Sequence, residues 1–501
     1  MLESVTDPFS DEGRMPTQRI LDDDLIRVRP RGTKKSTQRL PTLFWGDTVS
    51  IVGEENGQFV VALSRQRFDE ETGKTVQEPF EGLLPAKARF RDTGLLKVRF
   101  VDVGQGDGAI VDTPGGRRLI IDGGEERHIR NYVAAAYGHL LVDGPLHCDA
   151  IVVTHGDADH FSGLTKLVQS SRPDGSPLIT ADRVFHNGLV KRTADKDIDA
   201  FGKVVESDGT TFAVELKNDL TAVPDTQMNT PFRQWKQALK RLQQANSQLQ
   251  IRRLSYGAQD VFAFLGDEGI KCLVLGPIVD AVNGKPALRF LRTPGSKSLS
   301  ASHTINGHSV VLKLSYGNVR FLFGADLNEE AEERLLQRAG AEDISLTAEV
   351  LKVPHHGSAD FSPRALEAVR PVVSVISSGD ESISKEYIHP RAGLVGALGR
   401  YSRATVEKPL IYVTEMVAFF ERLGDVTAAG NGKLLAGGKS LDGNKIHNAY
   451  RKTAFGIVHV RTDGKRVLVV THSGKDDQKE SYAFQVDERG AVEFERKTRI
   501  I

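Results

Sequence analysis

The sequence has little cysteine: Cys148 and Cys272 are the only two among its 501 residues. Two thiols are too few for a disulfide framework or for a zinc site built from cysteines, and they fit a reducing compartment. No run approaches the ~20 apolar residues that span a bilayer. The first residues, MLESVTDPFSDEGR, contain no apolar signal core. We therefore expect a cytoplasmic protein that does not enter a membrane.

Net charge is also absent, because 66 lysines and arginines balance 66 aspartates and glutamates. This balance excludes a global electrostatic attraction to nucleic acid, but it allows a local basic patch. The remaining composition, 39% hydrophobic and 26% charged, is ordinary for a globular protein. The length is sufficient for two or three domains with a large core.

The first part of the chain divides into a leader and a small β module. Residues 1–40 are polar and contain the basic run Arg27–Lys35, which predicts a solvated leader or an arm that touches a polyanion. Within residues 41–92, two apolar segments flank Asn56-Gly57 and predict a β-hairpin. Such a module can bind a protein partner, although no residue identifies one.

The pattern changes at about residue 93 and predicts one large α/β domain over residues 93–423. Short apolar strands come first, and strands then alternate with helices, which favours helices packed outside sheets in layers. An insertion is expected at about 187–255, a Gly-rich loop at 424–450, and strands that complete the sheet at 451–501. The segments expected to be strands are Leu96–Val103, Ala109–Asp112, Arg118–Asp122, Ala150–Thr154, Ser309–Ser315, Val319–Phe323, Glu349–Val353 and Val372–Ser377.

Within the insertion, apolar residues recur at helical spacing from Phe232 to Leu242. A second stripe of the same helix carries Arg233, Lys236 and Lys240. One interpretation is a surface helix with a core face and a solvated face. The other is a basic helix that binds a phosphate-bearing substrate.

The strongest signal for chemistry is the segment THGDADH, which begins at Thr154. Four potential metal ligands, His155, Asp157, Asp159 and His160, directly follow a predicted strand. Imidazoles and carboxylates hold catalytic divalent metals. Two ions ~3.5–4 Å apart can share a bridging hydroxide that acts as the nucleophile. A polar turn that merely caps a helix would not need four such residues.

Further ligands are expected later in the chain. Asp326 follows the predicted strand Val319–Phe323, where an aspartate alone is more often a helix cap. His355 and His356 follow the predicted strand Glu349–Val353. Because they follow the first cluster in this order, Asp326 is a candidate for a carboxylate that bridges two ions, and the histidines are candidates for the ligand that completes the second site.

With these residues the sequence resembles the metallo-β-lactamase superfamily and, more narrowly, the hydrolase domains of ComEC-type competence proteins. The membrane segments of those proteins are missing, so DNA uptake is not implied. The blocks that carry the resemblance are Phe100–Asp107, Ile120–Gly124, Thr154–Gly163, Asn306–Leu312, Phe323–Asp326, Leu351–Ser358 and His389-Pro390.

The resemblance implies an αββα sandwich, preceded here by the small β module, with two divalent metal ions between the sheet edges. It assigns His155 and Asp157 to the first ion. It assigns Asp159 and His160 to the second, with Asp326 as the bridge. Asp157 stands where the superfamily usually has a histidine, which shifts the preference from zinc toward manganese or magnesium.

The resemblance also implies the closing ligands. Either His355 or His356 completes the second site, and His355 is favoured because it lies nearer the strand end. The third ligand of the first site is unclear, and His308 stands at that place. Asp159 and Lys352 are the expected catalytic residues, Lys352 by offsetting charge on a phosphate.

Several residues are expected to act behind the ligands, by orienting them. They are Asp122, Asp102, Asp107 and Asn306. His303 and His389 are expected to be ordinary histidines on the surface or behind the ligands.

Three functions remain open. The first is a phosphodiesterase or nuclease, for which Arg233, Lys236 and Lys240 would contact substrate phosphates. The second is a hydrolase of a small ester, lactone, thioester or amide, because the same nucleophile attacks a carbonyl. The third is a scaffold with the metal site but no catalysis, against which the intact ligand positions argue.

Overall fold

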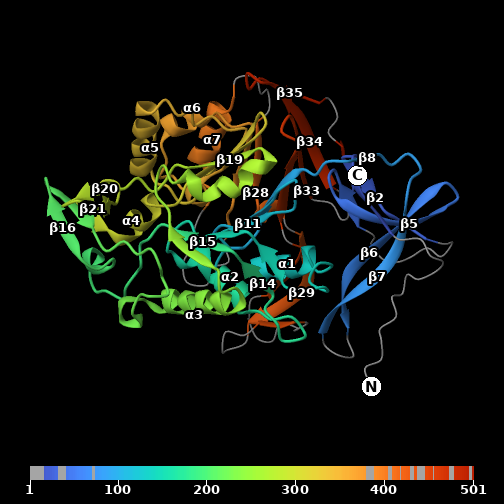
Figure 1. Ribbon diagram of the computed structural model, residues 1–501, viewed down its shortest axis with the longest axis horizontal. Helices are drawn as coiled ribbons and strands as arrows, with labels where there is room; N and C mark the ends of the chain where they lie inside the picture. The colour runs from blue at the N-terminus through green and yellow to red at the C-terminus, as the bar shows by residue number, and fades with distance from the viewer. Residues whose placement is uncertain are drawn as a thin grey trace. The chain divides into compact units, whose positions relative to one another are not determined.

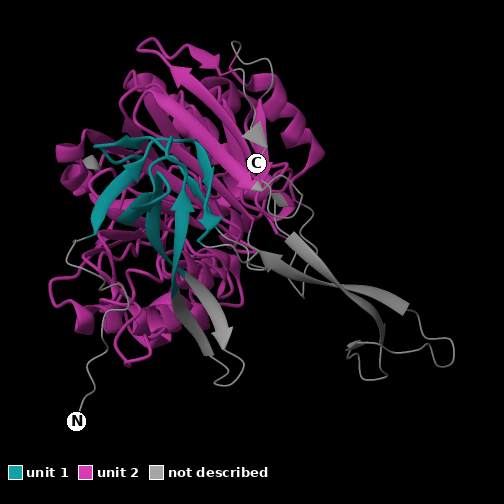
Figure 2. Cartoon of the chain, turned by 90° about the vertical axis from the view of Figure 1, so that its right-hand side faces the viewer, with its two compact units in different colours: residues 1–95, 501 teal, residues 96–500 magenta. Residues whose placement is uncertain are grey.

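The structure is a computed structural model with two compact units, residues 1–95 with 501 and residues 96–500 (Figure 2). The described residues are 16–31, 41–69, 74–379, 389–403, 409–417, 419–428, 434–436, 446–454, 456–472, 479–495 and 499–500.

The first unit is an antiparallel β structure. Its six-stranded sheet has the order β3-β7-β6-β5-β1-β8, and β2 pairs separately with β4. Asn56 and Gly57 both have positive φ, 49° and 73°, which is the turn that a two-residue hairpin requires. The strands are β1 (Thr17–Leu21), β2 (Leu25–Arg27), β3 (Arg29–Pro30), β4 (Thr42–Phe44), β5 (Thr48–Glu55), β6 (Gln58–Asp69), β7 (Lys74–Leu84) and β8 (Phe90–Arg91).

Three of these strands lie within the segment expected to be a polar leader. The reason is that Leu21 and Val28 are buried in the small core of this unit, and Leu25 is buried as well. A few apolar residues are therefore enough to bind the segment into the sheet, despite its polar composition.

The second unit is built on two sheets. The larger has the order β18-β15-β13-β11-β10-β9-β32-β33-β34-β35, with β36 beside β34. Its strands β11, β13, β15 and β18 run parallel, as expected for a region of strand–helix alternation. The bounds are β9 (Leu96–Val101), β10 (Ala109–Asp112), β11 (Arg118–Ile121), β13 (Ala150–Val152), β15 (Arg183–His186), β18 (Gln250–Arg253), β32 (Ile457–Thr462), β33 (Arg466–His472), β34 (Lys479–Val486), β35 (Val492–Phe494) and β36 (Arg499–Ile500).

The smaller sheet has the order β19-β24-β25-β26-β27-β28. Its last four strands run parallel. The bounds are β19 (Ile270–Val274), β24 (Leu312–Tyr316), β25 (Val319–Phe323), β26 (Val350–Lys352), β27 (Val373–Ile376) and β28 (Leu410–Val413).

The two sheets pack face to face around one apolar core, in which the rings of Phe100 and Phe323 lie 6.0 Å apart. Helices cover the outer faces, α1–α3 on the larger sheet and α5–α7 on the smaller (Figure 1). This order of layers confirms the predicted αββα sandwich. The helices are α1 (His128–Ala136), α2 (Ala158–Gln169), α3 (Thr230–Ala245), α4 (Ala301–Gly307), α5 (Glu329–Ala341), α6 (Pro363–Val369) and α7 (Ala392–Tyr401).

The insertion carries more structure than its polar composition suggests. Its strands β16 (Val204–Ser207) and β17 (Thr210–Ala213) form a four-stranded sheet with β21 (Lys285–Arg289) and β20 (Asp280–Val282). The segment that contains β20 and β21 lies beyond the expected insertion and supplies half of this sheet. Asn283 and Gly284, both with positive φ, form the turn between β20 and β21.

The segment predicted as a Gly-rich loop is partly a sheet. Strand β29 (Phe419–Ala428) pairs with β30 (Leu434–Ala436) and β31 (Ile446–Ala454). Residues 429–433 and 437–445 of the predicted loop lie outside the described residues. In the described part of the chain, no helix has the length and apolar character needed to cross a membrane.

Candidate metal centre

The candidate ligands come from the ends of strands in both sheets. His155 and Asp157 follow β13, and Asp159 and His160 lie in the first turn of α2, which begins at Ala158. Because carboxyl ends of parallel strands meet at one edge of a sheet, side chains that follow them can converge.

Asp326 and the histidine pair come from the smaller sheet. Asp326 lies between β25 and α5, and His355 and His356 follow β26. Both histidines have positive φ, 49° and 52°, so the backbone turns sharply where β26 ends. The residues that follow β25 and β26 in the smaller sheet thus converge with those that follow β13 in the larger sheet.

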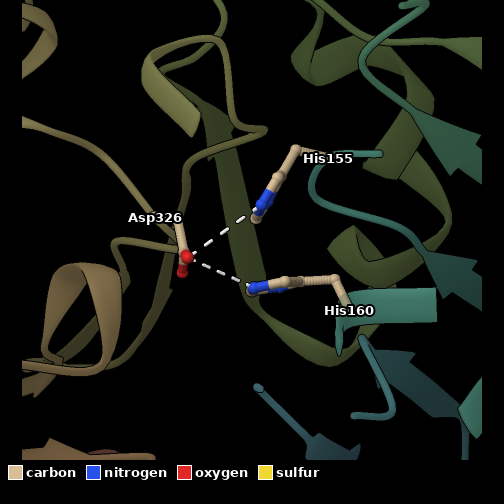
Figure 3. A group of neighbouring side chains, drawn as sticks. All are labelled: His155, His160 and Asp326. Carbon is tan, nitrogen blue, oxygen red and sulfur yellow. Dashed lines mark ion pairs between the residues drawn. The ribbon is translucent and has the colours of Figure 1, made fainter. Parts of the chain in front are cut away.

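Three buried ligand atoms meet at the centre of this arrangement (Figure 3). His160 Nε2 lies 3.3 Å from Asp326 Oδ2, and His155 Nε2 lies 4.0 Å from the same oxygen. All three side chains are buried. One oxygen of the carboxylate therefore lies within 4.0 Å of imidazoles from a loop and from α2, as an oxygen of a shared metal site would.

His356, which follows β26, joins this cluster. Its Nε2 lies 3.0 Å from Asp326 Oδ2 and 3.7 Å from Asp159 Oδ2. Asp159, His160 and His356 form one of the groups whose ligand atoms lie within 4.8 Å of one another. The structure thus brings His356 to the place that the sequence had favoured for His355.

The buried Nε2 atoms of the three histidines are left without hydrogen bonds. His155 Nε2, His160 Nε2 and His356 Nε2 have no hydrogen-bond partner among the described residues, and neither has Asp326 Oδ1. Buried polar atoms are rarely left in this state unless an ion or water satisfies them. Imidazole nitrogens and carboxylate oxygens are the donors that divalent metals take. The residues present therefore fit a metal ion.

Asp122 orients the cluster from behind. It accepts hydrogen bonds from Thr154 N at 2.8 Å and Thr154 Oγ1 at 2.6 Å, and its Oδ2 lies 2.9 Å from His160 Nδ1. A carboxylate on one ring nitrogen fixes the tautomer and aims the other nitrogen at the metal. The structure therefore brings Asp122 to the far ring nitrogen of His160, and its role in supporting a metal ligand stays a prediction.

Asp107 is a second supporting carboxylate, and it holds His356. Its Oδ1 lies 3.2 Å from His356 Nδ1, which is also 3.0 Å from the carbonyl oxygen of Ser377. Lys352 forms a short ion pair with Asp107, and its Nζ donates to the carbonyl of Ala325 at 3.0 Å. Lys352 is buried and does not line the cavity described below. Its position therefore differs from that of the substrate-contacting residue expected from the sequence.

The charges of the cluster shift the pKa values of its histidines in opposite directions. Burial lowers the pKa of His155 well below its usual range. Burial also opposes the charged form of His160, but Asp326 and Asp122 outweigh it and raise the pKa of His160. In the same way, Asp326 and Asp107 raise the pKa of His356 to about 10 against the effect of burial. The carboxylates thus favour positive charge at the centre.

Two of the predicted ligands do not join the converging groups of the described chain. His308 is buried with its Nε2 2.8 Å from the carbonyl oxygen of Arg289, and it belongs to none of the ligand groups found in the described chain. His355 lines the cavity, and its Nε2 lies 3.3 Å from Asn306 Nδ2. A sequence cannot separate His355 from His356, because the two positive φ values decide which ring turns inward.

The remaining supporting residues lie near the cluster or at its rim. Asp102 Oδ1 accepts a hydrogen bond from the Gly104 backbone at 3.0 Å. His303 lies 3.0 Å from Asp360, outside the cavity lining, whereas His389 is part of that lining. Asn306 also faces the cavity, so it is closer to a substrate than a purely supporting residue would be.

Lys191 is a site residue that the sequence analysis missed. It follows β15, and its Nζ donates to Asp157 Oδ1 at 2.8 Å. Burial raises the pKa of Asp157, and Lys191 opposes this shift. A lone lysine after a strand carries no motif, so only the fold brings this charge to the centre.

The three basic residues predicted on α3 do not line the cavity. Arg233 donates to the carbonyl of Met228 at 2.7 Å. Lys236 donates to Asp225 at 2.8 Å, and Lys240 is exposed near the same carboxylate. The basic stripe thus makes contacts within its own insertion.

A cavity of about 450 Å³ opens onto the centre. This size is that of a small-molecule site. Among the described residues that line the cavity, Lys191 is the sole lysine or arginine. They are Gln105, Glu125, Gly156, Asp157, Ala158, Asp159, Lys191, Asn229, Pro231, Ser302, Asn306, Asp326, His355, His356 and His389.

Residues 101–225 match the family model of the metallo-beta-lactamase superfamily. No curated protein matches the chain at a significant level. The part that matches the metallo-beta-lactamase model contains Asp122, the cluster His155–His160 and Lys191, whereas Asp326 and His356 lie beyond it. The match and the convergent ligands together support a metal-dependent hydrolase. The narrower resemblance to ComEC-type domains stays a prediction.

Proposed function

We propose that the chain is a metal-dependent phosphodiesterase with two divalent ions, manganese or zinc, and that a nucleic acid is a possible form of its substrate. The observation that carries the proposal is the oxygen-rich ligand set. Asp157, Asp159 and Asp326 all line the cavity. Hard carboxylate oxygens suit hard cations, which in turn suit phosphate oxygens.

The ligands divide between two positions in this proposal. His155 and Asp157 hold the first ion, and Asp159, His160 and His356 hold the second. Asp326 contributes to both. When bound, divalent ions supply Lewis acidity to a phosphoryl oxygen and lower the pKa of a water molecule.

The protein residues prepare this centre. Asp122 holds His160 through its Nδ1, and Asp107 holds His356 in the same way. Both imidazoles therefore direct Nε2 toward Asp326 before any substrate arrives. Such preorganisation avoids a cost of reorientation during the reaction.

A hydrolase of a small ester, lactone, thioester or amide is the alternative. The observation that favours it is the part of the cavity lining that the structure describes, which offers one lysine and includes the acidic Glu125. An extended polyanion would gain from more positive charge at this place.

A substrate panel separates these functions. The metal-loaded protein is incubated with single-stranded DNA, RNA, bis-p-nitrophenyl phosphate and a chromogenic lactam. We expect cleavage of the phosphodiesters, and hydrolysis of the lactam alone would refute the proposal.

The double variant Asp157→Ala/Asp159→Ala should lose at least ~100-fold in rate, because both carboxylates leave the ligand set. Asp195→Ala, an exposed residue of the insertion, is the control. Equal rates for the double variant and the control would assign the activity to another site or to a contaminant.

A further inference from the structure

The two proposed metal positions differ in how well their ligands converge. At the second position, His160, His356 and Asp159 have ligand atoms within 4.8 Å of one another. His160 Nε2 and His356 Nε2 lie 3.3 Å and 3.0 Å from Asp326 Oδ2. Two ligands each ~2.1 Å from one ion lie roughly 3.0–3.4 Å apart. The second position therefore already has the spacing that a single ion requires.

The first position is less complete. His155 Nε2 lies 4.0 Å from Asp326 Oδ2, and His308 is held by the Arg289 carbonyl instead of facing the cluster. Asp157 belongs to none of the groups of three or more ligand atoms that converge in the described chain. Its Oδ1 is instead bound by Lys191 Nζ at 2.8 Å.

The backbone of Lys191 is anchored. Its carbonyl accepts a hydrogen bond from Asn229 N at 2.9 Å, and the Asn229 side chain caps α3 through Phe232 N. The ring of Phe232 packs 5.1 Å from that of Phe161 in α2, the helix that carries His160. The insertion thus fixes the start of the lysine side chain beside the metal centre.

We propose that Lys191 controls the occupancy of the first metal position, because its ammonium group competes with a divalent ion for the Asp157 carboxylate. The inference rests on the ligand assignment of the proposed function. The second position fills first and tightly. The first position fills only when Lys191 gives up Asp157, so its ion binds weakly and exchanges readily.

The test is metal binding, measured without any substrate. Full-length protein is stripped with EDTA and dialysed, and Mn²⁺ is then titrated by calorimetry, with retained metal counted by elemental analysis. We expect one tightly held ion per chain in the wild type and a second that binds at higher concentration. In Lys191→Met, the second ion should bind about tenfold more tightly, because the Asp157 carboxylate no longer forms an ion pair with an ammonium group.

Two further variants control for charge and for folding. Lys191→Arg keeps the positive charge and should keep the weak second ion. Lys217→Met is the matched control, since Lys217 lies in the same insertion, is 29% exposed against 30% for Lys191, and does not line the cavity. Lys191→Ala takes the place of Lys191→Met if the latter does not show a cooperative melt.

The outcomes separate this inference from the proposed function. The inference would be overturned if the wild type bound two ions with equal affinity, or if Lys191→Met bound the second ion no more tightly than the wild type. Either result would leave the phosphodiesterase proposal intact. If neither the wild type nor any variant bound Mn²⁺, both the inference on Lys191 and the phosphodiesterase proposal would be overturned. Metal binding as expected, without cleavage of any phosphodiester, would refute the phosphodiesterase alone.

Discussion

Asp122 is a single residue behind the candidate ligands that orients the ring of His160. Its φ of 55° is unusual for an aspartate, and its carboxylate holds both Thr154 and His160. The strained backbone and the three contacts fix the imidazole before a metal binds.

We predict that Asp122→Ala lowers the affinity for Mn²⁺ about 10–100-fold, because His160 loses the partner that orients it. The measurement is a competition titration with a fluorescent chelator. Asp174→Ala, in an exposed turn, should leave the affinity unchanged. An unaltered affinity in Asp122→Ala would show that packing alone orients His160.

Single residues also mark the limit of sequence analysis. The spacing of THGDADH was enough to select His155 and His160, because a strand end followed by a helix places both near one cavity. It could not decide between His355 and His356, since their order in the chain does not give the direction of each ring. Lys191 carried no signal, because its partner Asp157 is close only in the fold.

At the scale of the element, α5 contains a buried acid. Glu332 lies on the inner side of this helix, where it accepts a hydrogen bond from Ser362 N. Burial raises the pKa of Glu332 to about 8, from an ordinary value of 4.5. The carboxyl is therefore protonated in the folded protein at neutral pH and ionised in the unfolded chain.

We predict that this residue makes the protein less stable as pH rises from 4.5 to about 8, because unfolding releases a proton over that range. Glu332→Gln should remove this dependence and stabilise the fold at pH 8 by on the order of a few kcal/mol. Thermal melts from pH 5 to 8 measure the effect. Glu330→Gln, an exposed neighbour on α5, should melt like the wild type at each pH.

Parallel behaviour of Glu332→Gln and the wild type across this pH range would contradict a protonated Glu332. Many groups titrate over this range. The test is therefore the difference in melting temperature between Glu332→Gln and the wild type at each pH.

Elements were easier to predict than their partners. The hairpin at Asn56-Gly57 and the helix of the insertion follow from local chemistry, because a primed turn and an apolar stripe depend on few neighbours. The pairing of β17 with β21 could not be foreseen, since residues far apart in the chain form it. For the same reason, strands β1–β3 were expected to be a solvated leader.

At the scale of the whole molecule, the pattern of strands and helices predicted helices packed outside sheets, and the αββα order itself came from the resemblance to the metallo-β-lactamase superfamily. The centre lies where both sheets end, so its ligands depend on the assembly of the entire second unit. An ion that binds this centre should stabilise the fold as a whole.

We predict that Mn²⁺ raises the melting temperature of the second unit and that EDTA lowers it. A free ion at 100 times its Kd adds about 2.7 kcal/mol to the free energy of unfolding. Differential scanning calorimetry with and without the ion measures the shift. Asp159→Ala should reduce the shift, and an equal shift in that variant would indicate that the ion binds elsewhere.

Strand β9 has a consequence for how the chain is made. It pairs on one side with β10, which follows soon after it, and on the other with β32, which lies near the end of the chain. During synthesis, β9 therefore keeps an open edge of unpaired amide and carbonyl groups until Ile457–Thr462 leaves the ribosome. Such an edge is a template for association with other nascent chains. The yield of folded protein should therefore depend on how quickly the last strands are supplied.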